Sequence, residues 1–158
     1  MATVDHSVQL EPGTSRDLDG VMKVMEAAFG TRYGEAWTRS QCAGILPMSG
    51  VSLMLARDAD REPVGFSLSR SVAREAELLL LAVRPDRHRE GIGTRLLNHF
   101  MESARTSGAR RVHLEVRDGN PAVEMYRAAG FHAAGRRQNY YRAPNGRQFD
   151  AVTLARDI

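Results

Sequence analysis

The chain has 158 residues, of which 42% are apolar and 26% are charged, a composition typical of one soluble globular domain over 1–158 and too apolar for a disordered protein. The longest apolar run, residues 78–83, is too short to span a bilayer, and residues 1–13 lack the regions of a signal peptide, so we expect a cytoplasmic protein without membrane contact. The single cysteine, Cys42, excludes an internal disulfide and a cysteine-cluster zinc site.

The net charge of +3 comes from arginine, because Lys23 is the only lysine among the 22 basic residues. Arginine favours bidentate recognition of phosphate and carboxylate groups. Acidic residues are interspersed with the arginines, however, and no nucleic-acid-binding signature occurs. We therefore expect no direct nucleic-acid partner, with an RNA-associated protein as the weakest alternative. The five histidines show no metal-ligand spacing, so we expect no metal. The sequence does not define the oligomeric state.

The first half of the chain predicts two helices and four strands. A short strand over 7–10 ends before Pro12 and Gly13, and a helix over 15–29 has apolar residues at helical spacing. Thr38 with Gln41 resembles a capping box, which predicts a helix over 38–46 followed by a loop over 47–50. Strands are predicted over 51–57, 63–73 and 77–83, and the unbroken leucines of the last indicate burial on both faces.

The second half alternates helices with strands and ends in a hairpin. We predict a helix over 91–107, a strand over 112–116, a helix over 120–129, and hairpin strands over 132–142 and 149–155. Hairpin connections and helical crossovers are thus combined in one chain, and no internal repeat occurs. The sequence predicts a single α/β domain with a mixed central sheet of about seven strands and flanking helices.

A basic loop and two glycines separate the strand ending at Val83 from the next helix. Gly91 and Gly93 allow backbone N–H groups to approach a ligand, and the helix N-terminus adds free donors and a positive dipole end. This pattern predicts a phosphate site. The arginines close enough to add attraction are Arg84, Arg87, Arg89 and Arg95. The segment is neither a Walker A loop nor a Rossmann fingerprint, and the competing interpretation is a plain helix start with exposed arginines.

The stretch 89–94, placed after a buried strand and before a helix, resembles the pyrophosphate loop of the GNAT superfamily of acyl-CoA-dependent N-acetyltransferases. The order of elements also matches that fold along nearly the whole chain. His88 stands where the family usually has Gln or Arg. The resemblance implies acetyl-CoA as cosubstrate, held at Leu81, Ala82 and Val83 along the pantetheine arm and at Arg89, Glu90, Gly91, Ile92, Gly93 and Thr94 in the loop.

A second group of motifs follows in residues 114–117, at Asn120 and Tyr126, and in residues 130–131, 136–141 and 146–147. Together they resemble the ribosomal-protein-alanine N-acetyltransferase branch of that superfamily, although the spacing from Asn120 to Tyr126 is one residue shorter than usual. The resemblance implies that Glu115 is the general base, that Tyr126 is the general acid and that Asn120 contacts acetyl-CoA. The implied partner is a protein N-terminus, the N-terminal alanine of a small-subunit ribosomal protein.

Each of these residues also has a plain structural interpretation. Glu115 fits an exposed face residue paired with Arg117, and Tyr126 fits a core tyrosine. We expect direct transfer to the amine, because Cys42 lies away from every motif. Two alternative functions stay open: a GNAT enzyme that acetylates another amine, such as a lysine side chain or a small molecule, and a non-catalytic acyl-CoA-binding regulatory module. We expect acceptor specificity to reside in residues 30–50 and 136–147.

Overall fold

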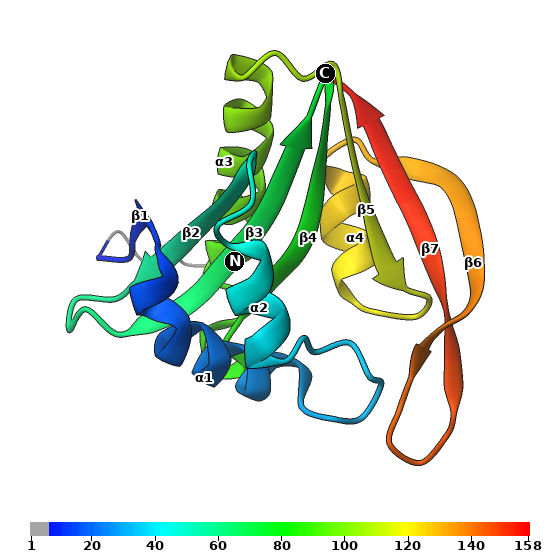
Figure 1. Cartoon of the computed structure of the whole chain (residues 1–158), viewed down its shortest axis with the longest axis horizontal. Helices are drawn as coiled ribbons and strands as arrows, with labels where there is room; N and C mark the ends of the chain where they lie inside the picture. Colours follow the sequence, from blue (N-terminus) through cyan, green and yellow to red (C-terminus); the bar gives the residue numbers. More distant parts are fainter. Residues whose placement is uncertain (1–6) are drawn as a thin grey trace.

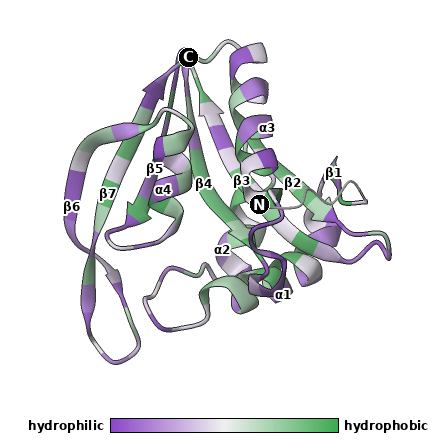
Figure 2. Ribbon diagram, turned by 180° about the vertical axis from the view of Figure 1, so that it is seen from behind, coloured by the Kyte–Doolittle hydropathy of each residue, from purple (hydrophilic) through white to green (hydrophobic). Residues whose placement is uncertain are grey.

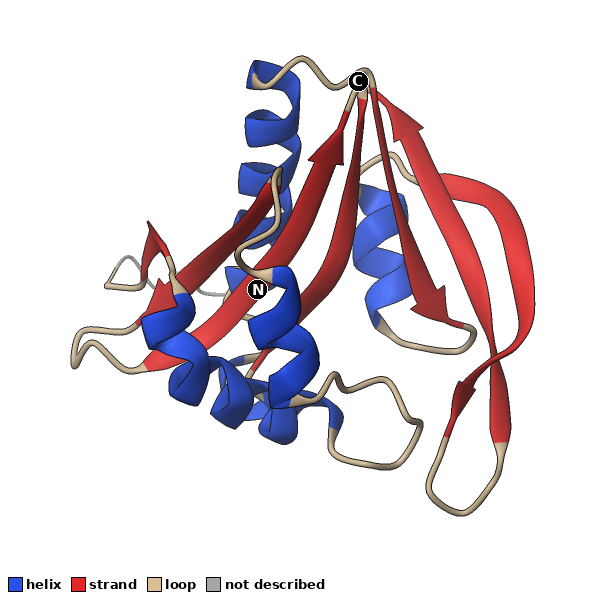
Figure 3. Cartoon of the chain, viewed as in Figure 1, coloured by secondary structure: helices blue, strands red, loops and turns tan. Residues whose placement is uncertain are grey.

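The structure, a computed structural model, describes residues 7–158. The expectation about a signal peptide therefore lies partly outside the described residues. Within this range the chain forms one seven-stranded sheet in the order β1-β2-β3-β4-β5-β7-β6 (Figures 1 and 3). The elements are β1 (Gln9–Pro12), α1 (Leu18–Phe29), α2 (Arg39–Ile45), β2 (Val51–Arg57), β3 (Pro63–Val72), β4 (Glu75–Val83), α3 (Ile92–Thr106), β5 (Arg111–Arg117), α4 (Ala122–Ala128), β6 (His132–Arg142) and β7 (Gln148–Asp157).

The predicted order of helices and strands is confirmed, and the main difference lies at the first strand. We predicted a strand over 7–10, whereas β1 runs from Gln9 to Pro12. Because β1 is an edge strand that pairs only with β2, a proline without an N–H group can be part of it. Thr38 and Gln41 do form the predicted capping box, with hydrogen bonds of 2.7 and 3.1 Å between their side chains and main-chain amides.

Two helical layers cover the sheet. Helices α1 and α2 pack on one face over β2, β3 and β4, whereas α3 and α4 pack on the other face (Figures 1 and 2). Fully buried side chains fill the core, the largest being Phe66, Met25, Leu55, Leu68, Ile92, Leu96, Leu97, Leu114 and Leu154. No helix of residues 7–158 is long and apolar enough to cross a membrane. The arrangement is the predicted mixed sheet, since β4 and β5 are parallel and the other pairs are antiparallel.

The sheet opens between β4 and β5. The two strands pair only where Glu75–Leu78 lies beside Arg111–Leu114, and Figure 1 shows them together near the C-terminus and apart at their other ends. A bulge on β4 interrupts the ladder with β3 between Leu78 and Leu80, so that Leu79 and Leu80 both pack toward α1 and α2. Beyond Leu78, β4 has no neighbouring strand on its β5 side. The prediction that its leucines are buried on both faces is therefore wrong at Leu79 and Leu81, which are only half-buried.

Candidate active site

A cavity of about 900 Å³ occupies the opening between β4 and β5. It brings together residues predicted for the site from five separate segments: Leu81, Ala82, Val83, Arg89, Gly91, Ile92, Gly93, Thr94, Glu115, Asn120 and Tyr126 all line it. Glu90 is the exception. Its carboxylate binds Arg87, with 2.8 Å between Oε2 and Nε, and it does not line the cavity. The volume is ample for a small-molecule ligand.

The start of α3 forms one end of this cavity. Gly91 caps the helix in the left-handed region with φ +80°, and the first helical bond runs from the amide of Arg95 to the carbonyl of Gly91. The amides of Ile92, Gly93 and Thr94 accordingly have no backbone acceptor within residues 7–158. Three free donors at a helix N-terminus make an anion site. Gly93 has a second role, because a Cβ there would lie 3.2 Å from Sδ of Met125 on α4.

The arginines near this end contribute less than their sequence positions suggested. Arg84 binds Asp86 at 2.7 Å, and Arg95 donates to the carbonyl of Val8 at 2.8 Å. Neither of these two lines the cavity, whereas Arg87 and Arg89 do. Of the four predicted arginines, only Arg87 and Arg89 can therefore attract a phosphate in the cavity, and the helix amides supply the directed hydrogen bonds.

The open edge of β4 forms the wall next to α3. Residues 79–83 follow the last residue that pairs with β5, so their outward main-chain groups face the cavity. His88 stands where the family usually has Gln or Arg. Its Nε2 lies 3.0 Å from the carbonyl oxygen of Val83. This distance fits donation from a protonated ring nitrogen, which ties the basic loop to the end of β4.

Glu115 projects from β5 toward the cavity, with 12% of its side chain exposed. The hydroxyl of Thr153 on β7 donates to Oε2 at 2.7 Å, and Nε of Arg137 on β6 lies 3.0 Å from Oε1. The predicted pairing of Glu115 with Arg117 is wrong, because Arg117 binds Glu35 instead. Arg137 takes that place because β6 folds back along β7 and brings its side chain to the carboxylate.

Tyr126 lies on α4 with its ring packed edge-on against Phe131 and only 5% of its surface exposed. It lines the cavity, and within residues 7–158 no group bonds to its hydroxyl. Burial, and secondly the charge of Glu35, raises the pKa of Tyr126 well above its ordinary value. The phenol therefore stays protonated at neutral pH, and both interpretations hold: Tyr126 packs in the core and also faces the cavity.

Glu35 is a site residue that the sequence analysis missed. It lies in the loop between α1 and α2, where its Oε1 accepts from Nε of Arg117 at 3.0 Å and its Oε2 accepts from Nδ2 of Asn120 at 2.9 Å. About a tenth of each charged side chain is exposed, and the Arg117 guanidinium stacks 3.6 Å from the ring centre of Tyr33. We name Glu35, Arg117 and Asn120 the loop latch. No local signal could reveal it, because 82 residues separate Glu35 from Arg117.

Asn120 therefore uses both ends of its amide within the protein. Its Oδ1 accepts from the amide of Ala122, the first residue of α4, at 2.9 Å, while its Nδ2 donates to Glu35. Tyr141 on β6 completes this part of the site, with its hydroxyl 3.4 Å from the carbonyl oxygen of Glu115. Burial also raises the pKa of Tyr141. The cavity thus joins a carboxylate, two protonated phenols and a helix N-terminus.

Known proteins share this architecture. Residues 18–131 match the acetyltransferase (GNAT) family. The alanine N-acetyltransferase of ribosomal protein bS18 from Salmonella typhimurium is 35% identical over 133 residues, which cover 78% of this chain and 89% of that protein.

Solved structures agree with this result. The ribosomal-protein-S18-alanine N-acetyltransferase from Escherichia coli has a TM-score of 0.85 at 26% identity, covering 96% of this chain and 94% of its own. Ard1 from Thermoplasma volcanium has a TM-score of 0.84 at 25% identity, covering 96% and 98% of the two chains. The match over most of the chain, together with a cavity where β4 and β5 part, shows that the protein belongs to the GNAT family and is an N-acetyltransferase.

Proposed function

We propose that this enzyme transfers the acetyl group of acetyl-CoA to a protein N-terminal α-amine, and that its acceptor is the N-terminal alanine of a small-subunit ribosomal protein. The observation that carries the reaction is the placement of Glu115 and Tyr126 in one cavity, beside an open strand edge and a helix N-terminus. The similarity to alanine N-acetyltransferases of ribosomal protein bS18 supports the acceptor.

The residues present fit acetyl-CoA. The free amides of Ile92, Gly93 and Thr94 suit its diphosphate, and the unpaired edge of Leu81, Ala82 and Val83 suits its amide-bearing pantetheine arm. Acetyl-CoA supplies a reactive thioester carbonyl when bound. Among the loop residues, Gly91 sets the helix start, Arg89 adds positive charge and Glu90 fixes Arg87. Asn120 acts on the donor site indirectly, because it binds the amide of Ala122 at the start of α4, the helix that carries Tyr126.

Glu115 is the proposed general base. An α-amine attacks only when neutral, and its ordinary pKa of about 7.7–8.0 makes it easier to deprotonate than lysine at about 10.4. Thr153 and Arg137 hold the Glu115 carboxylate in one orientation, so that it can take the proton directly or through water. A main-chain N–H near Val83 would stabilise the oxyanion.

Tyr126 is the proposed general acid. Its raised pKa keeps the hydroxyl protonated, and without a partner in the described chain the hydroxyl is available to donate to the departing thiolate. The direction of this pKa shift favours a donor over a base, because a strongly basic phenolate would not form near neutral pH.

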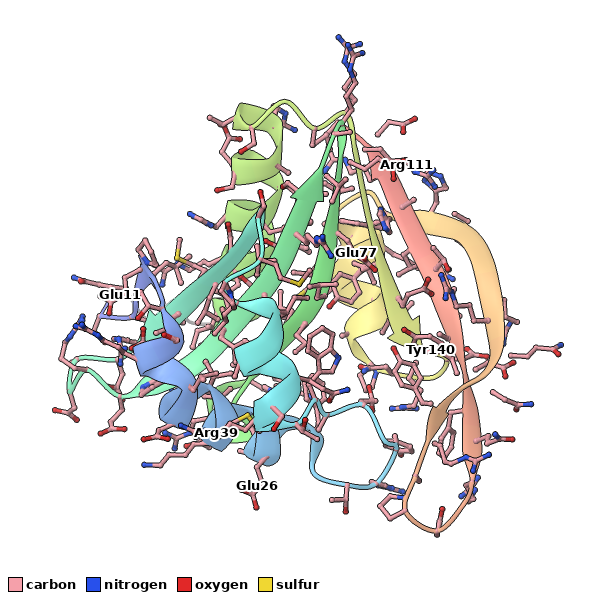
Figure 4. All side chains as sticks on the ribbon, viewed as in Figure 1. Glu11, Glu26, Arg39, Glu77, Arg111 and Tyr140 are labelled. Atoms are coloured by element: carbon pink, nitrogen blue, oxygen red, sulfur yellow. The ribbon has the colours of Figure 1, made fainter. Side chains whose placement is uncertain are left out.

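The test is acetyl transfer to a panel of peptides and amines with Glu115→Gln and Tyr126→Phe. Glu77→Gln is the matched control, at a partly exposed glutamate outside the cavity (Figure 4). We expect each site variant to lose about 10²–10⁴-fold in kcat with little change in acetyl-CoA affinity. Losses below about threefold for both variants would refute these roles.

The same panel separates the alternatives. Turnover of lysine peptides or small amines without turnover of Ala-initiated peptides would favour another acceptor. Binding of CoA that survives both substitutions, with no turnover by the unmodified enzyme, would indicate a regulatory module.

A further inference from the structure

A second cavity, of about 460 Å³, lies between β2, β3 and the C-terminal half of α3. It is on the face of the sheet opposite α1 and α2, where Figure 2 shows α3 beside these two strands. No residue lines both this cavity and the one proposed for acetyl transfer. Its volume is within the range of small-molecule sites. We name it the hydroxyl cleft, because serines supply most of its polar side chains.

Serines from both strands line the sheet side of the hydroxyl cleft. Ser67, Ser69 and Ser71 alternate along β3, so their side chains share one face of the sheet. Ser52 on β2 is the cross-strand partner of Ser69, an arrangement that brings two Cβ atoms to about 4.5–5.5 Å from each other. The hydroxyl groups therefore form a continuous patch rather than isolated points.

Helix α3 supplies polar groups on the other side of the hydroxyl cleft. His99 and Ser103 are four residues apart and hence on one side of the helix, and Ser107 is its C-cap residue. Phe100 and Ala104 are buried and line the same cavity. The hydroxyl cleft thus combines hydrogen-bonding groups from the sheet and the helix with the apolar surface of an aromatic ring.

The same face of the sheet is apolar and closely packed nearer the start of α3. At Gly65, two residues before Ser67, an added Cβ would lie 3.3 Å from Leu96 and 3.4 Å from Ile92, which belong to a buried apolar cluster. From Ser67 onward this face carries hydroxyl groups, and a cavity replaces the close packing. Protein interiors are normally filled, and serine is mostly an exposed residue, so stability of the core does not account for this lining.

The hydroxyl group of Ser67 has an unmet hydrogen-bonding capacity. Only 4% of the residue is exposed, and no group of residues 7–158 bonds to its side chain. The oxygen is not sealed inside the protein, because the one fully enclosed side-chain N or O atom without a partner in this range is Nε of Arg70. Since Ser67 lines the hydroxyl cleft, its hydroxyl group opens into it. A buried hydroxyl without a partner is unfavourable, and a bound molecule with hydrogen-bonding groups would remove that cost.

The chemistry of the lining indicates the class of ligand. Within residues 7–158, no lysine, arginine, aspartate or glutamate lines the hydroxyl cleft, so a charged molecule would lose hydration there without gaining a counter-ion. A serine hydroxyl both donates and accepts, as do the hydroxyl groups of a sugar or polyol. The C–H groups of such a molecule suit the apolar surface at Phe100. We infer that the hydroxyl cleft is a second binding site, which takes a neutral polyhydroxylated molecule of the sugar or polyol class.

NMR titration of the isotope-labelled whole chain with glucose, trehalose and myo-inositol tests this inference. We expect at least one of these compounds to shift the amide signals of residues 67–71 and 99–107 saturably, without displacing CoA from the first cavity. Glucose 6-phosphate and glucosamine, the charged counterparts of glucose, should not bind there. If none of the neutral compounds gives a saturable shift, the cleft holds water only and the inference is overturned. Preferential binding of a charged counterpart would overturn it as well.

Ser67→Ala and Ser69→Ala assign the binding to the hydroxyl cleft. Each variant removes one hydroxyl group and should weaken the affinity for the neutral compound about 3–10-fold. Neither hydroxyl has a partner within residues 7–158, so thermal melting of the free variants should match that of the unmodified chain and show that they fold. Ser40→Ala, at an exposed serine on α2, is the control and should leave the affinity unchanged. Unchanged affinity in both cleft variants would contradict the inference. None of these measurements depends on the acetyl acceptor, so the outcome is independent of the proposed function.

Discussion

Glu35→Ala would break the loop latch from one side. The substitution leaves the Arg117 guanidinium, which is about nine-tenths buried and stacked on Tyr33, without a counter-ion, and leaves Nδ2 of Asn120 without an acceptor. Removing one partner of a buried pair typically costs about 3–5 kcal/mol. We expect about 3 kcal/mol, the lower end, because each charged side chain keeps about a tenth of its surface in water. For a chain of this length that loss lowers Tm by about 6–12 °C.

Urea unfolding of Glu35→Ala, Arg117→Met and the double variant measures this cost as a cycle. The double variant should recover part of the loss, because replacing both members of a buried pair leaves no orphaned charge. Glu26→Ala, at an exposed glutamate on α1 (Figure 4), is the control and should shift stability by at most about 0.5 kcal/mol. A loss below about 1 kcal/mol for Glu35→Ala, or strictly additive effects, would refute the latch.

Three further predictions follow from backbone conformation and ionisation. Gly34→Ala, at φ +71° and facing the Arg142 carbonyl, should separate loop from hairpin and raise the acceptor KM more than the acetyl-CoA KM, as steady-state kinetics will show. Gly91→Ala, at φ +80°, should raise the acetyl-CoA KM more than the acceptor KM, because it distorts the amides at the start of α3. Calorimetry with CoA will measure the loss of affinity. Burial raises the pKa of Tyr126 and Tyr141, so the unfolded chain ionises first as pH rises and stability falls above about pH 10. Tyr126→Phe should remove about 1.4 kcal/mol per pH unit of that fall, and an unchanged slope in unfolding experiments at pH 10–11 would contradict the burial of its hydroxyl.

Local sequence signals predicted most of the fold because the interactions behind them span only a few residues. The capping box of Thr38 and Gln41 acts within one helical turn. The leucine run of β4 indicated a central strand correctly. Its bulge at Leu79 was not predictable, because the bulge depends on the register with β3, a property of two strands rather than one.

In the candidate site too, local features were predicted and contacts between distant residues were not. The predicted residues of the α3 loop, β5 and α4 do meet in one cavity, since each follows from the order of elements in the fold. Their partners did not follow from the sequence. Arg137 reaches Glu115 and Glu35 reaches Arg117 across 22 and 82 residues respectively, and charge composition alone cannot choose among many arginines. The family resemblance implied the roles of these residues, whereas the structure shows which groups contact their side chains.

The opening between β4 and β5 creates both the proposed donor site and the need for the loop latch. Parting the strands exposes main-chain groups for a ligand, but it also removes the bonds to β4 at the end of β5, which there pairs only with β7. The loop latch crosses this opening from the α1 side and ties Arg117 and the start of α4 to residue 35. Tyr126 therefore depends for its position on a loop whose Arg32, Tyr33 and Glu35 also line the cavity. Loss of the latch should consequently lower stability and acceptor binding together, whereas a purely structural ion pair would lower stability alone.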